Sequence, residues 1–135
     1  MSGQLSPRLS PDQARLLSPL QLAFVGDAVH ALLTRTHLIG ENLKVHDMHL
    51  RATRAVNAVS QARALQRILP LLTEEEAGLV RRGRNAHPHH GAPKSASVGE
   101  YAAATGLETL LGYLYLTGQT ERLLSLSPYL QAEEE

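Results

Sequence analysis

Two long apolar stretches, each with a single acidic residue, constrain this chain more than any other feature of its sequence. Residues 16–34 read LLSPLQLAFVGDAVHALLT, and Asp27 is their one residue ionised at neutral pH. Residues 102–118 read AAATGLETLLGYLYLTG, with Glu108 as their only charge. Each stretch suits a helix buried on most sides, where an unpaired carboxylate is strongly destabilising. Because neither stretch carries Lys or Arg, we expect the two carboxylates to meet across a helix contact and to share a divalent cation.

The composition favours one domain that spans residues 1–135. A length of 135 residues and a hydrophobic fraction of 43% suffice for a stable core without disulfides or structural metals. The sequence has no Cys, which excludes a disulfide scaffold and a thiolate metal site. No cleavable leader is recognisable, and an acid and Gly interrupt both apolar stretches. We therefore expect a cytoplasmic protein without a membrane span.

The charges are segregated along the chain, although the formal net charge is +0. Acids gather at residues 74–76 and at the carboxyl end. Basic residues occupy the middle of the chain, at Arg51, Arg54, Arg63, Arg67, Arg81, Arg82, Arg84 and Lys94. A neutral total can therefore conceal a basic face.

The apolar spacing predicts an all-α chain, because no stretch alternates with a period of two. The first long helix should begin at Pro19, with Ser18 as N-cap, and end near Leu38, before Gly40. Two capping boxes, Thr73–Glu76 and Ser97–Glu100, should start later helices. The other expectations are a helical turn opened by Ser10, an N-cap at Asp47, and helices at 48–69, at 74–85, from 97 to a stop at Gly118, at 120–126 and at 128–132.

The first long helix is apolar on more than one face. Such breadth suits a helix that packs both on its own core and on a partner subunit, so we expect a homodimer. The apolar residues concerned are Leu20, Leu22, Phe24, Val25, Val29, Leu32 and Leu33.

Asp27 and Glu108 allow two interpretations. Each acid could cap a helix or form a hydrogen bond inside the core, which is the usual role of a lone buried acid. Alternatively, acids on facing helices could converge on one Mg²⁺, an ion that accepts carboxylate oxygens and keeps several waters. A hydrated Mg²⁺ can polarise a phosphate and supply hydroxide, so this alternative predicts phosphodiester hydrolysis.

The run RRGRN at residues 81–85 places three guanidinium groups and an amide at a predicted helix end, and Lys94 follows across a loop. Basic residues there could simply complement the helix dipole. Three Arg in four residues also favour phosphate contact. The nearby His87, His89 and His90 could bind a transition metal or be exposed polar residues. Aromatic residues make up only 4% of the chain, which favours recognition of duplex shape over base stacking.

Three motifs carry a family resemblance: LAFVGDAV at residues 22–29, RRGRNA at 81–86 with Pro93-Lys94 downstream, and ATGLETLLGYLYL at 104–116. In order and spacing they resemble Mini-III, the small bacterial ribonuclease III class that lacks a separate double-stranded-RNA-binding domain. The resemblance covers a core of about residues 18–124. Ala23, Leu20 and Thr105 stand where full-length ribonuclease III carries further acids, a reduction that Mini-III shares.

The resemblance implies an all-helical ribonuclease III fold, a homodimer and Mg²⁺-dependent cleavage of double-stranded RNA, with Mn²⁺ as an alternative ion. It also implies maturation of the ends of large-subunit (23S) ribosomal RNA. By position, Asp27 matches the catalytic aspartate and Glu108 the metal-binding glutamate. Phosphate contacts are assigned to Arg81, Arg82, Arg84, Asn85 and Lys94.

The first hypothesis is thus an endoribonuclease that cuts a ribosomal RNA precursor, with a ribosomal protein as a candidate partner. The alternative is a binding module with the same fold that holds RNA or a ribosomal protein without cutting. Two acids in apolar helices favour the enzyme, since a pure binder gains nothing from an unpaired buried charge.

Overall fold

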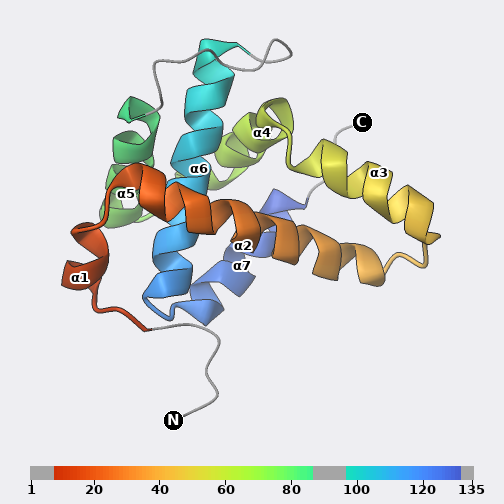
Figure 1. Cartoon of the computed structure of the whole chain (residues 1–135), viewed down its shortest axis with the longest axis horizontal. Helices are drawn as coiled ribbons and strands as arrows, with labels where there is room; N and C mark the ends of the chain where they lie inside the picture. Colours follow the sequence, from red (N-terminus) through yellow and green to blue (C-terminus); the bar gives the residue numbers. More distant parts are fainter. Residues whose placement is uncertain (1–7, 87–96, 132–135) are drawn as a thin grey trace.

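The structure, a computed structural model, describes residues 8–86 and 97–131, and within these ranges it contains helices and no strand (Figure 1). The all-α prediction is therefore confirmed. None of these helices has the length and apolar character needed to cross a membrane. The elements are α1 (Pro11–Arg15), α2 (Pro19–Ile39), α3 (Val45–Ala55), α4 (Ala58–Ile68), a 3-10 turn η1 (Leu69–Leu71), α5 (Glu74–Asn85), α6 (Val98–Leu116) and α7 (Thr120–Leu130).

Helix α6 is the centre of the fold, because α1, α2, α4, α5 and α7 all contact it. Figure 1 shows α2 crossing α6, with α5 on one side and α3 far out on the other. The side chains of Leu107, Leu110, Leu111 and Leu114 are fully buried. A helix that is apolar all round is expected to be enclosed in this way.

Glycines allow α2 and α6 to approach until their backbones touch. A Cβ atom built on Gly26 would overlap the carbonyl oxygen of Glu108, and one built on Gly112 would overlap that of Leu22. A Cβ on Gly106 would crowd α5 in the same manner. Only glycine permits helix backbones to lie this close to each other, so the position of α6 is fixed by backbone contacts.

The predicted caps at Ser18, Thr73 and Ser97 are confirmed. Each hydroxyl accepts the backbone N–H three residues later, and the side chain at that position accepts the N–H of the cap. Gly118 ends α6 with a φ of 74°, the left-handed conformation that favours glycine. Local sequence therefore determined where these helices begin and end.

The single helix predicted over residues 48–69 is wrong. The chain forms α3 and α4, and Asn57 caps α4 by accepting the amide of Ser60 at 2.8 Å. Asp47 is not an N-cap, since Lys44 precedes α3 and Asp47 lies in its first turn. Asn is among the best N-cap residues, and apolar spacing that continues across the break concealed it.

The two short helices predicted at 120–126 and 128–132 are also wrong, because α7 is continuous and contains Pro128. The proline costs one backbone hydrogen bond near the end of the helix. Burial of Leu123, Leu126 and Leu130 against the core offsets this loss. Tertiary packing thus overrides a local helix breaker.

The outer face of α2 is apolar and open to solvent in a single chain. Leu20, Phe24 and Leu32 are exposed to 42%, 81% and 62%. Leu22 and Val29 lie buried on the opposite side of the same helix. The predicted second apolar face is therefore present, and a large exposed apolar patch is typical of an interaction surface.

Candidate active site

Asp27 and Glu108 lie at the point where α2 crosses α6. The preceding residue, Gly26, touches the backbone of Glu108 itself, so Asp27 lies next to the glutamate. Glu108 is partly buried, whereas Asp27 is exposed. The expectation that both acids are enclosed on most sides is therefore wrong for Asp27, because α2 packs on α6 with one face only.

The two carboxyl groups interact directly. Burial raises the pKa of Glu108 to about 7, and a hydrogen bond from Gln61 acts in the opposite direction. The negative charge of Asp27 raises this pKa further. Burial and the charge of Asp27 therefore both favour the protonated form of Glu108.

Gln61 on α4 and His30 on α2 support Glu108 from inside the fold. The amide Nε2 of Gln61 donates to the Glu108 carboxylate at 3.2 Å and lies 3.0 Å from Nδ1 of His30. Since the amide donates, Nδ1 is the acceptor and the imidazole proton resides on Nε2. Burial lowers the pKa of His30 to about 4, despite the opposing charge of Asp27. The imidazole is therefore neutral at physiological pH.

Sequence reasoning missed Gln61 and His30. The signal for Gln61 was a polar residue at helical spacing from Ala64, Leu65 and Ile68, the buried stripe of α4. His30 follows Asp27 by one helical turn and is 1% exposed. In each case the clue was a polar side chain on an apolar stripe, which needs a partner in the core.

The pair of acids fits a hydrated divalent cation. Mg²⁺ prefers oxygen ligands and is commonly held by one or two carboxylates together with waters. A cation at this point would relieve the repulsion that raises the pKa of Glu108. In the described part of the chain, no group of three or more His, Cys, Asp and Glu side chains gathers at one place. Asp27 and Glu108 are thus the carboxylates available here.

The predicted phosphate contacts lie partly elsewhere. Arg81, Arg82 and Asn85 line a cavity of about 460 Å³ that also includes Arg15 and Glu75. Arg84 lies against α6 at Gly106, two residues before Glu108. Lys94 and the residues His87, His89 and His90 fall outside the described ranges. The structure therefore brings the two acids together and sets the basic end of α5 beside the same part of α6.

Comparison with known proteins agrees with this geometry. Residues 20–119 match the family described as Ribonuclease III domain. A Mini-ribonuclease 3 from Symbiobacterium thermophilum is 53% identical over 108 residues, which cover 79% of this chain and 82% of the relative. A Mini-ribonuclease 3 from a Synechococcus species is 44% identical over 94% of this chain and 90% of the relative.

A solved structure provides an independent match. An X-ray crystal structure of a Fusobacterium nucleatum protein superposes with a TM-score of 0.75 at 30% sequence identity. The alignment covers 84% of this chain and 91% of that one. Sequence relatives and helix arrangement agree with the resemblance carried by the three motifs. The chain therefore belongs to the ribonuclease III family, in its Mini-ribonuclease 3 group.

Proposed function

We propose that this chain, an endoribonuclease of the ribonuclease III family, cuts double-stranded RNA with Asp27 and Glu108 as ligands of a divalent cation. Mg²⁺ is the expected ion, with Mn²⁺ as a substitute. The observation that carries the proposal is the close approach of these two acids at the crossing of α2 and α6, where Gly26 touches the backbone of Glu108 and the pKa of Glu108 is raised to about 7 by burial and by the charge of Asp27. Such a contact destabilises the fold unless a bound cation compensates it, and groups perturbed in this way concentrate at functional sites.

A divalent cation held by the two carboxylates would supply a water of lowered pKa and would polarise the phosphate. The residues of the chain have separate tasks around it. Asp27 and Glu108 would hold that cation. In hydrolysis the water oxygen bonds to phosphorus, one phosphorus–oxygen bond of the strand breaks, and the released oxygen takes up a proton. Gln61 holds the Glu108 carboxylate in one orientation through the 3.2 Å hydrogen bond. His30 stays neutral and holds Gln61 in turn.

The basic end of α5 supplies affinity in this proposal. Arg81, Arg82, Arg84 and Asn85, with Lys94 downstream, contact phosphates beside the scissile one. Gly83 and Gly106 support this arrangement, because they bring α5 against the part of α6 that carries Glu108.

A homodimer completes the active form. The exposed apolar face of α2, with Phe24 at 81% exposure, supplies the surface that a second copy would cover. Two-fold symmetry would then give two acid pairs, one for each strand of a duplex. The physiological substrate proposed is the duplex at the ends of the 23S ribosomal RNA precursor, cut in the cytoplasm either with a ribosomal protein as partner or without one.

The decisive experiment is cleavage of a structured duplex RNA with Mg²⁺, with Mn²⁺ and with chelator. Cleavage should require the ion, and Asp27→Asn and Glu108→Gln should each retain less than about a tenth of wild-type activity while still binding RNA. Circular dichroism and gel shift serve as controls for folding and binding. A wild-type protein that binds duplex RNA but never cuts it would support the non-cutting module instead.

A further inference from the structure

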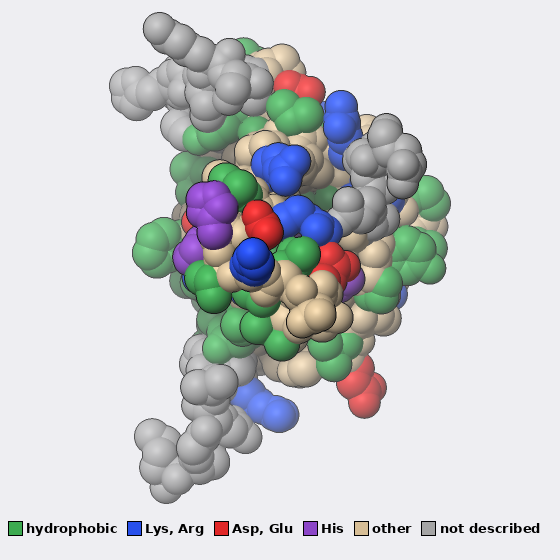
Figure 2. Space-filling view, turned by 90° about the vertical axis from the view of Figure 1, so that its right-hand side faces the viewer, with side chains coloured by type: hydrophobic (Ala, Val, Ile, Leu, Met, Phe, Trp, Pro, Cys, Tyr) green, Lys and Arg blue, Asp and Glu red, His purple; other side chains and the backbone are tan. Residues whose placement is uncertain are grey.

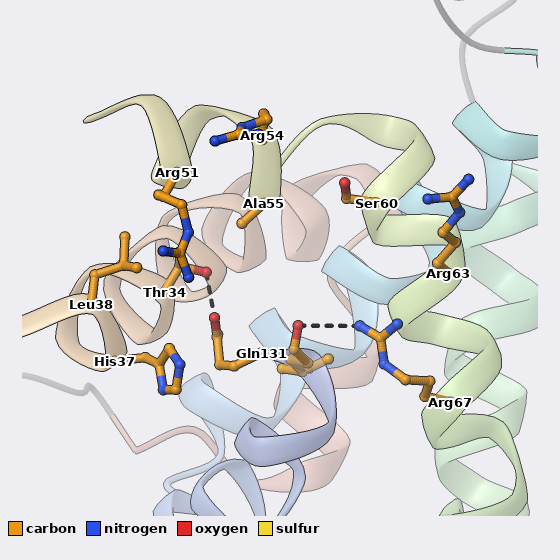
Figure 3. A pocket seen from close by; sticks show the side chains of 11 residues that line it. Thr34, His37, Leu38, Arg51, Arg54, Ala55, Ser60, Arg63, Arg67 and Gln131 are labelled. Atoms are coloured by element: carbon orange, nitrogen blue, oxygen red, sulfur yellow. Dashed lines mark hydrogen bonds between the residues drawn. The ribbon is translucent and has the colours of Figure 1, made fainter. Parts of the chain in front are cut away.

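A second polar cavity, of about 450 Å³, lies between α2, α3, α4 and α7. Four arginines line it: Arg51 and Arg54 from α3, and Arg63 and Arg67 from α4. In Figure 3, Arg51 and Arg67 extend from opposite sides toward Gln131. Figure 2 shows several Lys and Arg side chains across the middle of the face that carries α3, with Asp and Glu side chains between them. We call these four residues and the space between them the arginine pocket.

Part of the positive charge of the arginine pocket is uncompensated within the described chain. Glu41 forms an ion pair with Arg51 at 2.8 Å. Arg67 donates to the backbone carbonyl of Tyr129 at 2.7 Å. Arg54 and Arg63 are exposed and form no ion pair with any described residue. Among residues 8–86 and 97–131, these two guanidinium groups therefore have no carboxylate that neutralises them, which favours an anionic ligand.

The lining also indicates which part of a ligand fits. The remaining polar side chains are those of Ser60, His37 and Gln131, which can complete hydrogen bonds to phosphate oxygens, and that of Thr34, which is buried and accepts from Gln131 at 3.2 Å. None of the lining residues is Phe, Tyr or Trp, so a nucleobase would find no such ring to stack on. This chemistry suits phosphate groups better than a complete mononucleotide.

The arginine pocket continues the candidate active site along two helices. On α4, Ser60 and Arg63 flank Gln61, which contacts Glu108. On α2, Thr34 follows His30 by one turn and Asp27 by two. Seven residues of helix correspond to about 10 Å, or about three phosphates along one strand. A strand seated on the acid pair could thus reach the arginine pocket without leaving the protein surface.

From these observations we propose that the arginine pocket binds backbone phosphates of the RNA substrate beyond the cleavage site. The inference rests on the proposed function, because it assumes that duplex RNA occupies the acid pair. Guanidinium groups match phosphate oxygens in a bidentate geometry, and such contacts set affinity and register without reading sequence. The arginine pocket then determines how far the duplex must extend for tight binding.

The test compares Arg54→Ala, Arg63→Ala and their double variant with Arg8→Ala. Arg8 is also an exposed arginine and lies against Gly118, at the junction of α6 and α7. Binding of a duplex RNA is measured by fluorescence anisotropy over a range of salt concentrations, in an Asp27→Asn background that prevents cutting. Cleavage by the same variants with Asp27 intact gives KM and kcat.

The dissociation constant of the double variant for duplex RNA should be about tenfold higher than that of wild type, or more. The slope of log affinity against log salt concentration should become shallower by about 1 for each phosphate that is no longer neutralised. KM should rise while kcat at saturating RNA stays near the wild-type value. Arg8→Ala should change neither quantity. If wild type binds and cuts RNA but the double variant has unchanged affinity and slope, this inference is wrong and the proposed function stands. If wild type neither binds nor cuts, both are wrong.

Two further arms identify other occupants. In the first arm, inorganic tripolyphosphate is added in a thermal unfolding assay. If tripolyphosphate raises the unfolding temperature of wild type but not of the double variant, and the two bind RNA equally well, the arginine pocket binds a free phosphate ligand. Glu133–Glu135 follow Gln131 in the sequence and lie outside the described ranges. Destabilisation on changing these three residues to Gln, with RNA affinity insensitive to Arg54 and Arg63, would assign it to the chain's own acidic end. Either result would overturn the RNA assignment.

Discussion

The side-chain amide of Gln61 joins Glu108 to the buried side of the fold, with 3.2 Å between Nε2 and the carboxylate oxygen. The same nitrogen lies 3.0 Å from Nδ1 of His30. A carboxylate fixed from behind in this way presents one oxygen outward with little rotational freedom. In the proposed site Gln61 is thus a positioning residue, because it would act on a cation only through Glu108.

Replacing Gln61 by Leu should weaken binding of the cation without unfolding the protein. Loss of an outer hydrogen-bond partner commonly costs a metal site about tenfold or more in affinity. The concentration of Mg²⁺ that gives half-maximal cleavage should rise accordingly, and calorimetric titration with Mn²⁺ should report weaker binding. Gln66→Leu is the matched control, since Gln66 is exposed on the same helix. If the two variants need the same Mg²⁺ concentration for half-maximal cleavage, Gln61 does not contribute to cation binding.

The raised pKa of Glu108 predicts how stability depends on pH in the absence of divalent metal. Between about 4.5 and about 7 the folded state binds more protons at Glu108 than the unfolded state does. This contribution to the free energy of unfolding is therefore fully present at low pH and decreases as pH rises through that window. His30, with its pKa lowered to about 4, gives the opposite dependence between about 4 and about 6.5.

The two contributions oppose each other, so the wild-type profile alone is uninformative. The difference in unfolding free energy between wild type and Glu108→Gln isolates the glutamate. As pH rises from 4.5 to 7, we expect the unfolding free energy of wild type to fall relative to that of Glu108→Gln by up to about 1.4 kcal/mol for each pH unit. Above pH 7 the difference should be constant. Urea denaturation in chelator measures it. A difference that is constant with pH would contradict the raised pKa.

Gly26→Ala should be severely destabilising. The added methyl group would overlap the carbonyl oxygen of Glu108, and neither backbone can move without separating α2 from α6. Overpacking of this kind costs about 3 kcal/mol or more. Gly78→Ala is the control: it lies within α5, and a Cβ there would have its nearest neighbour at 3.6 Å. This second change should stabilise the protein by about 1 kcal/mol through helix propensity alone, as thermal unfolding would reveal.

Phe24→Glu should convert a dimer into a monomer. The side chain is 81% exposed on the apolar face of α2, and a charge there would have to be buried on association. Sedimentation velocity at micromolar concentration gives the mass. Leu124→Glu, at another exposed apolar residue on α7, should leave the mass unchanged. If wild type is itself a monomer and still cuts both strands, the paired arrangement of active sites must be abandoned.

Helix starts were predictable because their signals are local. Ser18, Thr73 and Ser97 each satisfy backbone groups within one turn, so a few letters of sequence contain the whole interaction. The break at Asn57 and the continuity of α7 through Pro128 depend on packing across the core, which no short window contains.

The candidate site divides in the same manner. Asp27 and Glu108 were identifiable because each is the only charge in a long apolar stretch. Gln61 was not, because a neutral amide on an amphipathic helix has no distinctive pattern. Its role depends on the spatial meeting of α4 with α6, which brings together residues 47 positions apart in the sequence.

Helix α3 contributes no buried side chain and packs mainly on α2 and α4, whereas α6 is enclosed by five other helices. Segments with few buried apolar contacts open at low free energy, while central ones open only when the whole domain unfolds. Hydrogen exchange in α3 should therefore precede exchange in α6 by a wide margin. On heating, the half of the arginine pocket that α3 supplies should come apart before the acid pair does, leaving a protein that still hydrolyses RNA but holds it weakly.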